Sequence, residues 1–367
     1  MKAAIVGCGK IADAHAEEIG KLPGVNLVSV CDLEPLMAEQ LAARYGIKSW
    51  YSDLTAMLST EKPDVLHITT PPQSHLALTR QAISAGAHVF LEKPVALYHS
   101  EVQAIVDAVR DAGKKLGVNY WPQFEEQALQ LRRLVAAGVI GDPVHIDSYI
   151  GYNLAGDFGT AIRNDPNHWV CRMPGQLFQN VLDHVVNRIV PFIEDDDPAV
   201  TAFGYQGSAE DAAAFHLLDE LRVIVRGDRT SAYVTFSAHS RPVSNLLHVY
   251  GTKNSAHVDY NSRTIVLERS QPFPSALGRL FPPFQISRDY FKQGLKNVGR
   301  FRRARFHFFD GMRTLLTEFY RSVETGSPSP TSDGEILRVS SIMHRIFSQI
   351  YPISQNAAHP AHAEASK

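Results

Sequence analysis

Residues 2–12 read KAAIVGCGKIA, and this segment decides the fold class of the first third of the chain. Its first five residues predict a short buried strand, and residues 10–22 predict a helix. Gly7 permits the tight turn between the two, Gly9 lets a pyrophosphate approach the backbone, and Ala12 allows close packing of the helix on the strand. The free amides at the helix start favour phosphate. We expect the turn to bind a dinucleotide through Gly7, Gly9, Lys10, Ile11 and Ala12.

An acidic residue follows the second predicted strand, which covers residues 26–31. This residue is Asp32, about 20 residues after the glycine turn, where a carboxylate accepts hydrogen bonds from ribose hydroxyls and repels a 2′-phosphate. The pattern therefore favours NAD, with NADP as the less favoured cofactor. Two other interpretations remain open: a glycine turn that binds no cofactor, and Asp32 as a helix N-cap.

Strands and helices alternate through the rest of the first 120 residues. Strands are predicted at 2–6, 26–31, 64–69, 88–91 and 116–119, and helices at 10–22, 34–45, 73–85 and 100–112. This alternation is typical of a parallel sheet with helical crossovers. We expect an α/β Rossmann domain over residues 1–120.

The pattern changes after residue 120, where strands follow one another with few helices between them. Strands are predicted at 144–152, 200–206, 215–218, 221–225, 231–237, 246–250, 256–260 and 264–268, and helices at 125–136, 311–324 and 334–349. Such a run of strands predicts an α+β domain, over residues 121–352, with a large and mostly antiparallel sheet. Residues 353–367 are rich in Ala and His without periodicity, and we expect a disordered tail there.

Composition excludes several classes of protein. The formal net charge of −2 over 367 residues provides no general attraction for nucleic acid. Cys8, Cys31 and Cys171 are odd in number and widely spaced, which argues against a disulfide framework and favours a reducing compartment. No apolar run approaches the roughly 20 residues of a membrane-spanning helix. We expect a soluble, cytoplasmic protein.

Two further motifs follow predicted strands. The third strand ends in Thr69-Thr70-Pro71-Pro72, with His75 in the next helix, and the fourth ends in Glu92-Lys93-Pro94. Together with the glycine turn, these motifs resemble the glucose–fructose oxidoreductase / inositol dehydrogenase (Gfo/Idh/MocA) family. The resemblance implies a Rossmann domain followed by an open-faced sheet domain, a nicotinamide cofactor and a carbohydrate-like substrate. It also implies a homodimer or homotetramer built by packing the open sheets.

Polar residues at the predicted strand ends are expected to meet the nicotinamide half of the cofactor, because ligands of open α/β folds bind at the carboxyl ends of the strands. These residues are Thr70, Pro71, Glu92, Lys93 and Asn119. A secondary alcohol that loses a hydride to NAD also loses a proton to a base, and a nearby cation stabilises the product carbonyl. Lys93 suits both tasks, and the resemblance implies that it assists proton transfer. For His75, a cofactor contact and a structural hydrogen bond remain open alternatives.

The second half departs from the family pattern of a glycine cluster, an aspartate and a histidine four residues later. If His184 is that histidine, Asn180 occupies the aspartate position and Gly175 alone remains of the cluster. His184 can then serve as the general acid and base, while Asn180 holds a sugar hydroxyl, or Lys93 works alone. Asp183 projects about 100° from His184 on a helix and replaces the missing acid only if the helix is shifted. We expect no metal site, because no third ligand has a recognisable spacing.

Other residues near this motif are candidates for substrate binding. The expected substrate-binding residues, besides Lys93, are Tyr120, Arg163, Trp169, Arg172, Asn180, Asp183 and His184, and His168 can join them. Gln123 stands where the family often places an arginine. Basic and aromatic residues are interleaved over residues 277–309. That segment predicts either a surface that contacts a membrane or a diphosphate-linked substrate, or an amphipathic helix packed on its own sheet.

The sequence thus predicts an NAD-dependent dehydrogenase or reductase that transfers a hydride between nicotinamide and a hydroxyl carbon of a sugar, sugar derivative or nucleotide sugar. Two alternatives remain open. The first is an NAD-dependent glycosidase that oxidises its substrate transiently. The second is a non-catalytic sensor of dinucleotide or sugar with the same fold.

Overall fold

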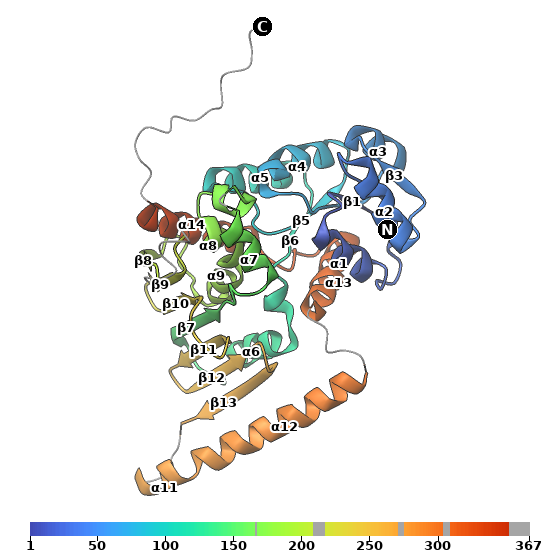
Figure 1. The fold of residues 1–367 in the computed structure, drawn as a ribbon. Helices are drawn as coiled ribbons and strands as arrows, with labels where there is room; N and C mark the ends of the chain where they lie inside the picture. Colours follow the sequence, from blue (N-terminus) through green and yellow to red (C-terminus); the bar gives the residue numbers. More distant parts are fainter. Residues whose placement is uncertain (166, 208–216, 271–274, 304–308, 352–367) are drawn as a thin grey trace.

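The computed structural model describes residues 1–165, 167–207, 217–270, 275–303 and 309–351. Two sheets form its framework, and helices cover both faces of the first (Figure 1). The predicted tail at 353–367 lies outside the described residues.

The first sheet has the strand order β3-β2-β1-β4-β5-β6, and all of its neighbouring strands are parallel. Its strands are β1 (Lys2–Val6), β2 (Asn26–Cys31), β3 (Ser49–Tyr51), β4 (Val65–Ile68), β5 (His88–Leu91) and β6 (Leu116–Val118). Every residue of β4 is buried, as expected for a central parallel strand that is covered on both faces. The prediction of an α/β Rossmann fold is confirmed.

The helices of this half are α1 (Lys10–Ile19), α2 (Pro35–Tyr45), α3 (Leu54–Glu61), α4 (His75–Ser84) and α5 (His99–Asp111). Helix α1 ends three residues earlier than predicted, because the amide of Gly20 caps it on the carbonyl of Ala16. The sequence analysis missed β3 and α3. The strand is too short to show a period, although Asp53 marks the start of α3 by accepting a hydrogen bond from the amide of Ala56 at 2.6 Å.

The second sheet has the order β13-β12-β11-β7-β10-β9-β8 and is antiparallel except between β7 and β10. Its strands are β7 (Pro143–Gly151), β8 (Ala199–Tyr205), β9 (Glu220–Arg226), β10 (Ser231–Ser237), β11 (Asn245–Gly251), β12 (Asn254–Asp259) and β13 (Thr264–Arg269). The prediction of a mostly antiparallel second sheet is confirmed. The strand predicted at 215–218 is wrong where it can be checked, since Leu217 and Leu218 lie in irregular chain; Phe215 lies outside the described residues.

Alternating burial gives the second sheet one covered face and one open face. Helices α9 (Asp183–Ile189) and α14 (Asp333–Ile350) pack on the covered face. Phe203, Ile224 and Tyr233 are exposed on the other. Helix α6 (Glu126–Ala136) packs against β12 and β13, and α8 (Gln176–Val181) packs against α9; α7 (Asp157–Asn164) precedes α8 in the chain. The structure holds one chain, so oligomers built through the open face remain a prediction.

The C-terminal helices return to the first sheet. Helix α13 (Asp310–Thr325) contacts α1 and places the ring of Phe319 5.2 Å from that of Phe90 on β5. Helix α14 packs against α5 as well as β8. We retain the division into 1–120 and 121–352 as a proposal, with α13 contributing to the packing of the first unit. No helix within the described ranges has the length and apolar character needed to cross a bilayer.

Candidate functional site

The glycine turn leaves open space in front of α1. Gly7 has a φ of +92°, and a Cβ atom there would lie 2.6 Å from Cγ2 of Thr70, so only glycine fits. A Cβ on Gly9, by contrast, would meet nothing within 4 Å. Gly9 caps α1 without a side-chain hydrogen bond, while Ala12 is fully buried against the sheet. The start of α1 therefore borders open space at Gly9, which suits a diphosphate.

Asp32 stands beside this turn at the end of β2. Its carboxylate accepts hydrogen bonds from the amides of Cys8, at 2.6 Å, and Glu34, at 2.9 Å. A cavity of about 600 Å³ opens next to it. The lining includes Gly7, Gly9, Asp32, Leu33, Met37, Leu54, Thr69, Thr70, Pro71, Ser74 and Leu78. Sequence reasoning missed Leu33, which is 94% exposed directly after Asp32 and offers an apolar wall.

The loop after β4 supplies the opposite wall of this cavity. Thr70 shares a 2.7 Å hydrogen bond with the hydroxyl of Ser74, and Pro71 lies between them in sequence. His75 is fully buried, with Nε2 2.8 Å from the carbonyl of Thr70 and Nδ1 3.0 Å from that of Val95. Burial lowers the pKa of His75. Both ring nitrogens face backbone carbonyls, and the neutral ring donates to one of them; this buried placement favours the structural alternative for His75.

Glu92, at the end of β5, is a buried carboxylate with several donors. Its Oε1 atom is 2.8 Å from Nε2 of His15 and accepts from Nδ2 of Asn119 at 2.5 Å, while Oε2 accepts from the amide of Lys93 at 3.1 Å. Burial alone would raise the pKa of Glu92, but the hydrogen bonds and the charge of His15 hold it below its usual value. Glu92 and Asn119 therefore fix the strand end that carries Lys93.

From Glu92 and His15, a buried series of hydrogen bonds continues through His67 to Tyr320. Nδ1 of His15 is 2.9 Å from Nδ1 of His67, whose Nε2 is 2.8 Å from the hydroxyl of Tyr320 on α13. Burial and the neighbouring His15 lower the pKa of His67 well below its usual value, so that ring is neutral. Nε2 of His15 donates to the ionised Glu92, and the other two contacts can be satisfied in two directions: Nδ1 of His15 accepts from His67, which then accepts from the Tyr320 hydroxyl, or Nδ1 donates to His67, which then donates to Tyr320. Sequence reasoning missed this chain, although a histidine inside the apolar β4 was a signal.

Lys93 crosses from the first sheet to the second half of the chain. Its Nζ atom donates a 2.9 Å hydrogen bond to the backbone carbonyl of Asn180 on α8. The side chain of Asn180 is half-buried and makes no hydrogen bond within the described part of the chain. The structure thus brings together two residues that the sequence assigned to one site.

Asp183 and His184 begin the next helix, α9, after a one-residue break at Leu182. Asp183 is buried with no partner for Oδ2, and burial raises its pKa to about 7 even though Lys93 acts to lower it. Burial, Lys93 and Arg188 together lower the pKa of His184 well below its usual value. At neutral pH His184 is therefore an uncharged imidazole close to a lysine, and its unprotonated nitrogen can accept a hydrogen bond from a hydroxyl.

Arg188, which sequence reasoning also missed, lies on α9 four residues after His184. Its guanidinium is fully buried, donates to the carbonyl of His184 and to Oδ1 of Asn245 at 2.7 Å, and lies 4.3 Å from the centre of the Tyr260 ring. Such stacking and hydrogen bonding compensate the burial of a guanidinium. Arg188 thereby fixes the turn that presents His184.

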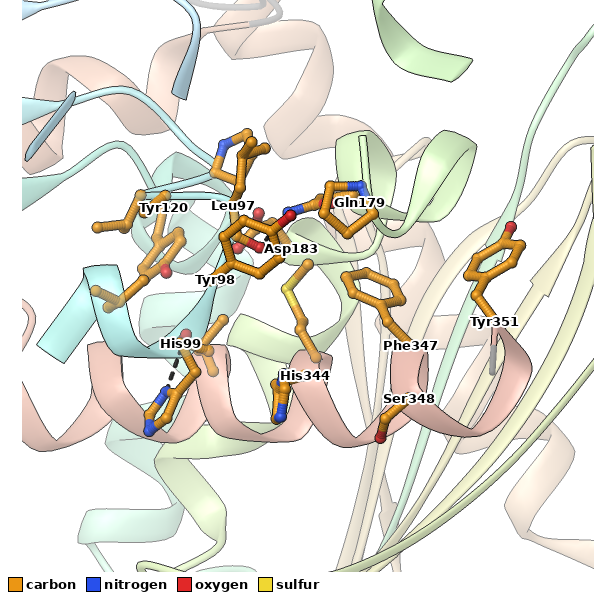
Figure 2. Close-up of a pocket in the computed structure, with 18 residues that line it drawn as sticks. Leu97, Tyr98, His99, Tyr120, Gln179, Asp183, His344, Phe347, Ser348 and Tyr351 are labelled. Carbon is orange, nitrogen blue, oxygen red and sulfur yellow. Dashed lines mark hydrogen bonds between the residues drawn. The ribbon is translucent and has the colours of Figure 1, made fainter. Parts of the chain in front are cut away.

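A small cavity of about 90 Å³ lies beside these residues, between the loop 94–99 and α14 (Figure 2). Figure 2 shows Asp183, Tyr120 and Gln179 grouped at its wall, opposite Phe347. Tyr120 is fully buried there, and burial raises the pKa of its hydroxyl well above its usual value. Its ring lies in the core and also lines this cavity, and the expectation of Tyr120 as a substrate contact stays a prediction.

The remaining substrate candidates lie on the segment before α8. Trp169 is exposed on a short 3₁₀ turn, and Arg172 is exposed with its guanidinium on the carbonyl of Asn167 at 2.7 and 2.9 Å. Arg163 belongs to α7, but its side chain is not among the described groups. Within the described ranges, no group of three or more His, Cys, Asp or Glu residues is arranged to hold a metal ion.

The first part of the chain is similar to a known protein family. Residues 1–120 match the model of the GFO_IDH_MocA oxidoreductase family, described as an NAD-binding Rossmann fold. Over 143 residues, the chain is 36% identical to the D-glucoside 3-dehydrogenase of Escherichia coli, covering 39% of this chain and 41% of that enzyme. It is 29% identical over 150 residues to the scyllo-inositol 2-dehydrogenase (NAD(+)) of Bacillus subtilis, covering 41% of this chain and 44% of that enzyme. The aligned part thus spans less than half the length of these two relatives.

Solved structures match over nearly the whole chain. An NAD-binding oxidoreductase from Klebsiella pneumoniae superimposes with a TM-score of 0.75 at 20% identity, covering 95% of this chain and 96% of the other. The WlbA dehydrogenase of Bordetella pertussis, solved with NADH and UDP-GlcNAcA, gives a TM-score of 0.72 at 18% identity and covers 95% of each chain. At these identities the likeness establishes the fold.

Proposed function

We propose that the chain is an NAD-dependent dehydrogenase or reductase acting on a hydroxyl carbon, because residues 1–120 match the model of the NAD-binding Rossmann domain of the GFO_IDH_MocA oxidoreductase family. Its substrate is a sugar, a polyol, a sugar derivative or a nucleotide sugar. One observation carries the proposal: Lys93 reaches from the end of β5 to Asn180, beside Asp183 and His184. A cation, a neutral imidazole and an amide thus adjoin the carboxyl edge of a dinucleotide-binding sheet.

The residues around the glycine turn fit NAD. Gly9 leaves the space that a diphosphate needs, and the carboxylate of Asp32 is held at the rim of the cavity, where it would accept the ribose hydroxyls. Leu33 and Leu78 offer apolar surface for an adenine ring. The negative charge of Asp32 supports NAD over NADP. When bound, NAD exchanges a hydride with the carbon that bears the reacting hydroxyl.

The chain itself supplies the binding of the hydroxyl and the movement of its proton. The Lys93 ammonium binds the oxygen that becomes the carbonyl and stabilises its developing negative charge. The neutral His184 accepts the hydroxyl proton, and Asn180 binds a neighbouring hydroxyl. Glu92, held by His15 and Asn119, positions the backbone of Lys93.

Carbohydrate-like substrates are favoured because Lys93, Asn180 and His184 can all form hydrogen bonds with hydroxyl groups. Two relatives carry names of enzymes acting on a glucoside and an inositol, and one solved relative holds a nucleotide sugar. Trp169, exposed before α8, offers a ring face on which a sugar can stack.

The first experiment is a fluorescence titration of the full chain with NADH and NADPH, followed by an absorbance assay of nicotinamide reduction with inositols, glucosides and nucleotide sugars. We expect NADH to bind at least about tenfold more tightly than NADPH, and turnover with at least one member of the panel. Failure to bind either cofactor would overturn the proposal.

Lys93→Met tests the chemical role separately from cofactor binding. We expect a fall in kcat of about 10²–10⁴ with the Kd for NADH unchanged, because Lys93 acts on the substrate oxygen. Lys48→Met, at an exposed lysine far from β5, is the matched control. Equal turnover in the Lys93 and Lys48 variants would exclude Lys93 from the reaction.

A further inference from the structure

Helix α12 (Pro282–Arg302) lies along the outer edge of the second sheet, beside β13 (Figure 1). None of its 21 residues is buried. Polar side chains on its inner side bond to the sheet: Nε2 of Gln293 donates to the carbonyl of Ile265 at 3.2 Å, and Nδ2 of Asn297 to that of Ser262 at 2.7 Å. The helix therefore turns its polar face toward the protein, the reverse of an ordinary amphipathic surface helix.

The opposite face of α12 is apolar and exposed. Phe284, Phe291, Leu295 and Val298 follow one another at intervals of seven, four and three residues, which places them on one stripe. Phe284 and Phe291 are 69% and 68% exposed. The stripe continues into the short helix α11 (Ser275–Leu280) through Leu277 and Leu280. We call this exposed stripe the α12 face.

Basic residues border the α12 face. Between residues 275 and 303 the chain carries seven basic residues and one acid, Asp289, although its overall formal charge is −2. Lys296 and Arg300 pair with Glu126, and Arg288 pairs with Asp289. The other four make no ion pair with any described residue: Arg279, Lys292, Arg302 and Arg303. The face therefore combines exposed Phe and Leu with uncompensated positive charge.

These observations select among possible occupants. Two copies of the chain that met through this face about a two-fold axis would oppose like charges across the contact. An anionic lipid surface satisfies both features at once, because the acyl boundary takes the apolar stripe and the phosphates take the lysines and arginines. We propose that the α12 face docks the protein on a bilayer containing anionic phospholipid.

This geometry leaves the glycine turn accessible. In Figure 1, α12 lies at the far end of the molecule from the helices that surround the glycine turn, α2 and α3. The proposal does not depend on the proposed dehydrogenase activity, and its test reads out membrane binding alone.

The test is co-sedimentation of the full chain with vesicles of phosphatidylcholine, with and without phosphatidylglycerol. We expect binding to vesicles that contain phosphatidylglycerol, weakened by salt, and little binding to phosphatidylcholine alone. Phe291→Ser with Leu295→Ser should reduce the bound fraction by about fivefold or more. Phe203→Ser, which removes an aromatic ring of 66% exposure from the open sheet face, is the matched control and should bind as the parent does.

Because all three positions are exposed, thermal melts of the variants should match that of the parent. Lys292→Glu with Arg302→Glu tests the electrostatic part and should abolish the preference for phosphatidylglycerol. Equal binding to both vesicle types, or binding to neither, would overturn the proposal. So would self-association that requires Phe291 and proceeds without lipid, which would assign the face to a second copy of the chain.

Discussion

Nζ of Lys93 donates a 2.9 Å hydrogen bond to the backbone carbonyl of Asn180, 87 residues further along the chain. The contact joins the end of β5 in the first sheet to α8 in the second half. Because it uses the backbone of Asn180, it does not depend on which side chain occupies position 180. The contact is therefore the same whether an asparagine or an aspartate stands at position 180.

The side chain of Asn180 can accordingly be tested apart from Lys93. Asn180→Ala should lower kcat/KM by about three- to tenfold, the value of one hydrogen bond to a substrate hydroxyl, mainly through KM. The Kd for NADH should stay within about twofold, since the backbone contact to Lys93 remains. Steady-state kinetics on the best substrate of the panel would measure both. A loss confined to kcat would contradict a binding role for Asn180.

Gly7 and Gly9 should respond differently to the same substitution. Gly7→Ala places a methyl group 2.6 Å from Thr70 at positive φ, so we expect a loss of about 2 kcal/mol or more in unfolding free energy. Gly9→Ala meets only open space and should keep its stability within about 0.5 kcal/mol. It should nonetheless weaken NADH binding by at least about tenfold, because the methyl group enters the space for the diphosphate. Urea unfolding and fluorescence titration give the two readouts; NADH binding undiminished by Gly9→Ala would remove the diphosphate from this turn.

Asp32 should determine the choice between NAD and NADP. Asp32→Ser removes the charge that opposes a 2′-phosphate and the acceptor for the ribose hydroxyls. We expect the ratio of the Kd values for NADPH and NADH to fall by about tenfold or more, mainly through weaker binding of NADH. Glu34→Ser, at an exposed acid two residues away, is the control. A ratio unchanged by Asp32→Ser would assign Asp32 the structural role alone.

Asp183 should make stability depend on pH. The native pKa of about 7 lies above the unfolded value near 4, so the native chain binds the extra proton between these values. The stabilising contribution is present below about pH 4 and is lost as the pH rises through about 7. Asp183→Asn is neutral at every pH. Its unfolding free energy, relative to that of the parent, should therefore rise by about 2–4 kcal/mol as the pH goes from 5 to 8. Urea midpoints at the two pH values measure this gain, and an equal difference at both would refute it.

The hydrogen-bonded side chains of Glu92, His15, His67 and Tyr320 should behave as one unit. His15→Leu removes a donor from buried Glu92 and leaves His67 without its partner, at a cost of about 2–4 kcal/mol. His67→Leu should cost a similar amount, and the double variant clearly less than their sum. Because the native pKa of Glu92 is depressed, its contribution is present above the unfolded pKa and lost as the pH falls. His15→Leu should therefore raise the pH midpoint of acid unfolding, while strictly additive costs would show that the residues act separately.

Much of the first sheet was predictable because its signals are local. A strand, a glycine turn, a helix and an acid at the next strand end are each defined within a few residues, and β1, β2 and β5 occur as predicted. The three-residue β3 escaped prediction because so short a strand shows no period. The placement of α13 against α1 escaped because no local pattern says which surface a C-terminal helix covers.

The candidate site also combines features that follow from local sequence with features that depend on tertiary contacts. The sequence by itself determined the glycine turn, Asp32 and the strand-end motif Glu92-Lys93-Pro94, since turn conformation and strand ends follow from neighbouring residues. Only the tertiary structure decided that Lys93 meets Asn180, that His15, His67 and Tyr320 hold Glu92, and that Tyr120 and His75 are buried. It also decided that α12 turns its apolar face outward. These facts depend on burial and on contacts between residues far apart in the chain, which is why the order of residues alone does not reveal them.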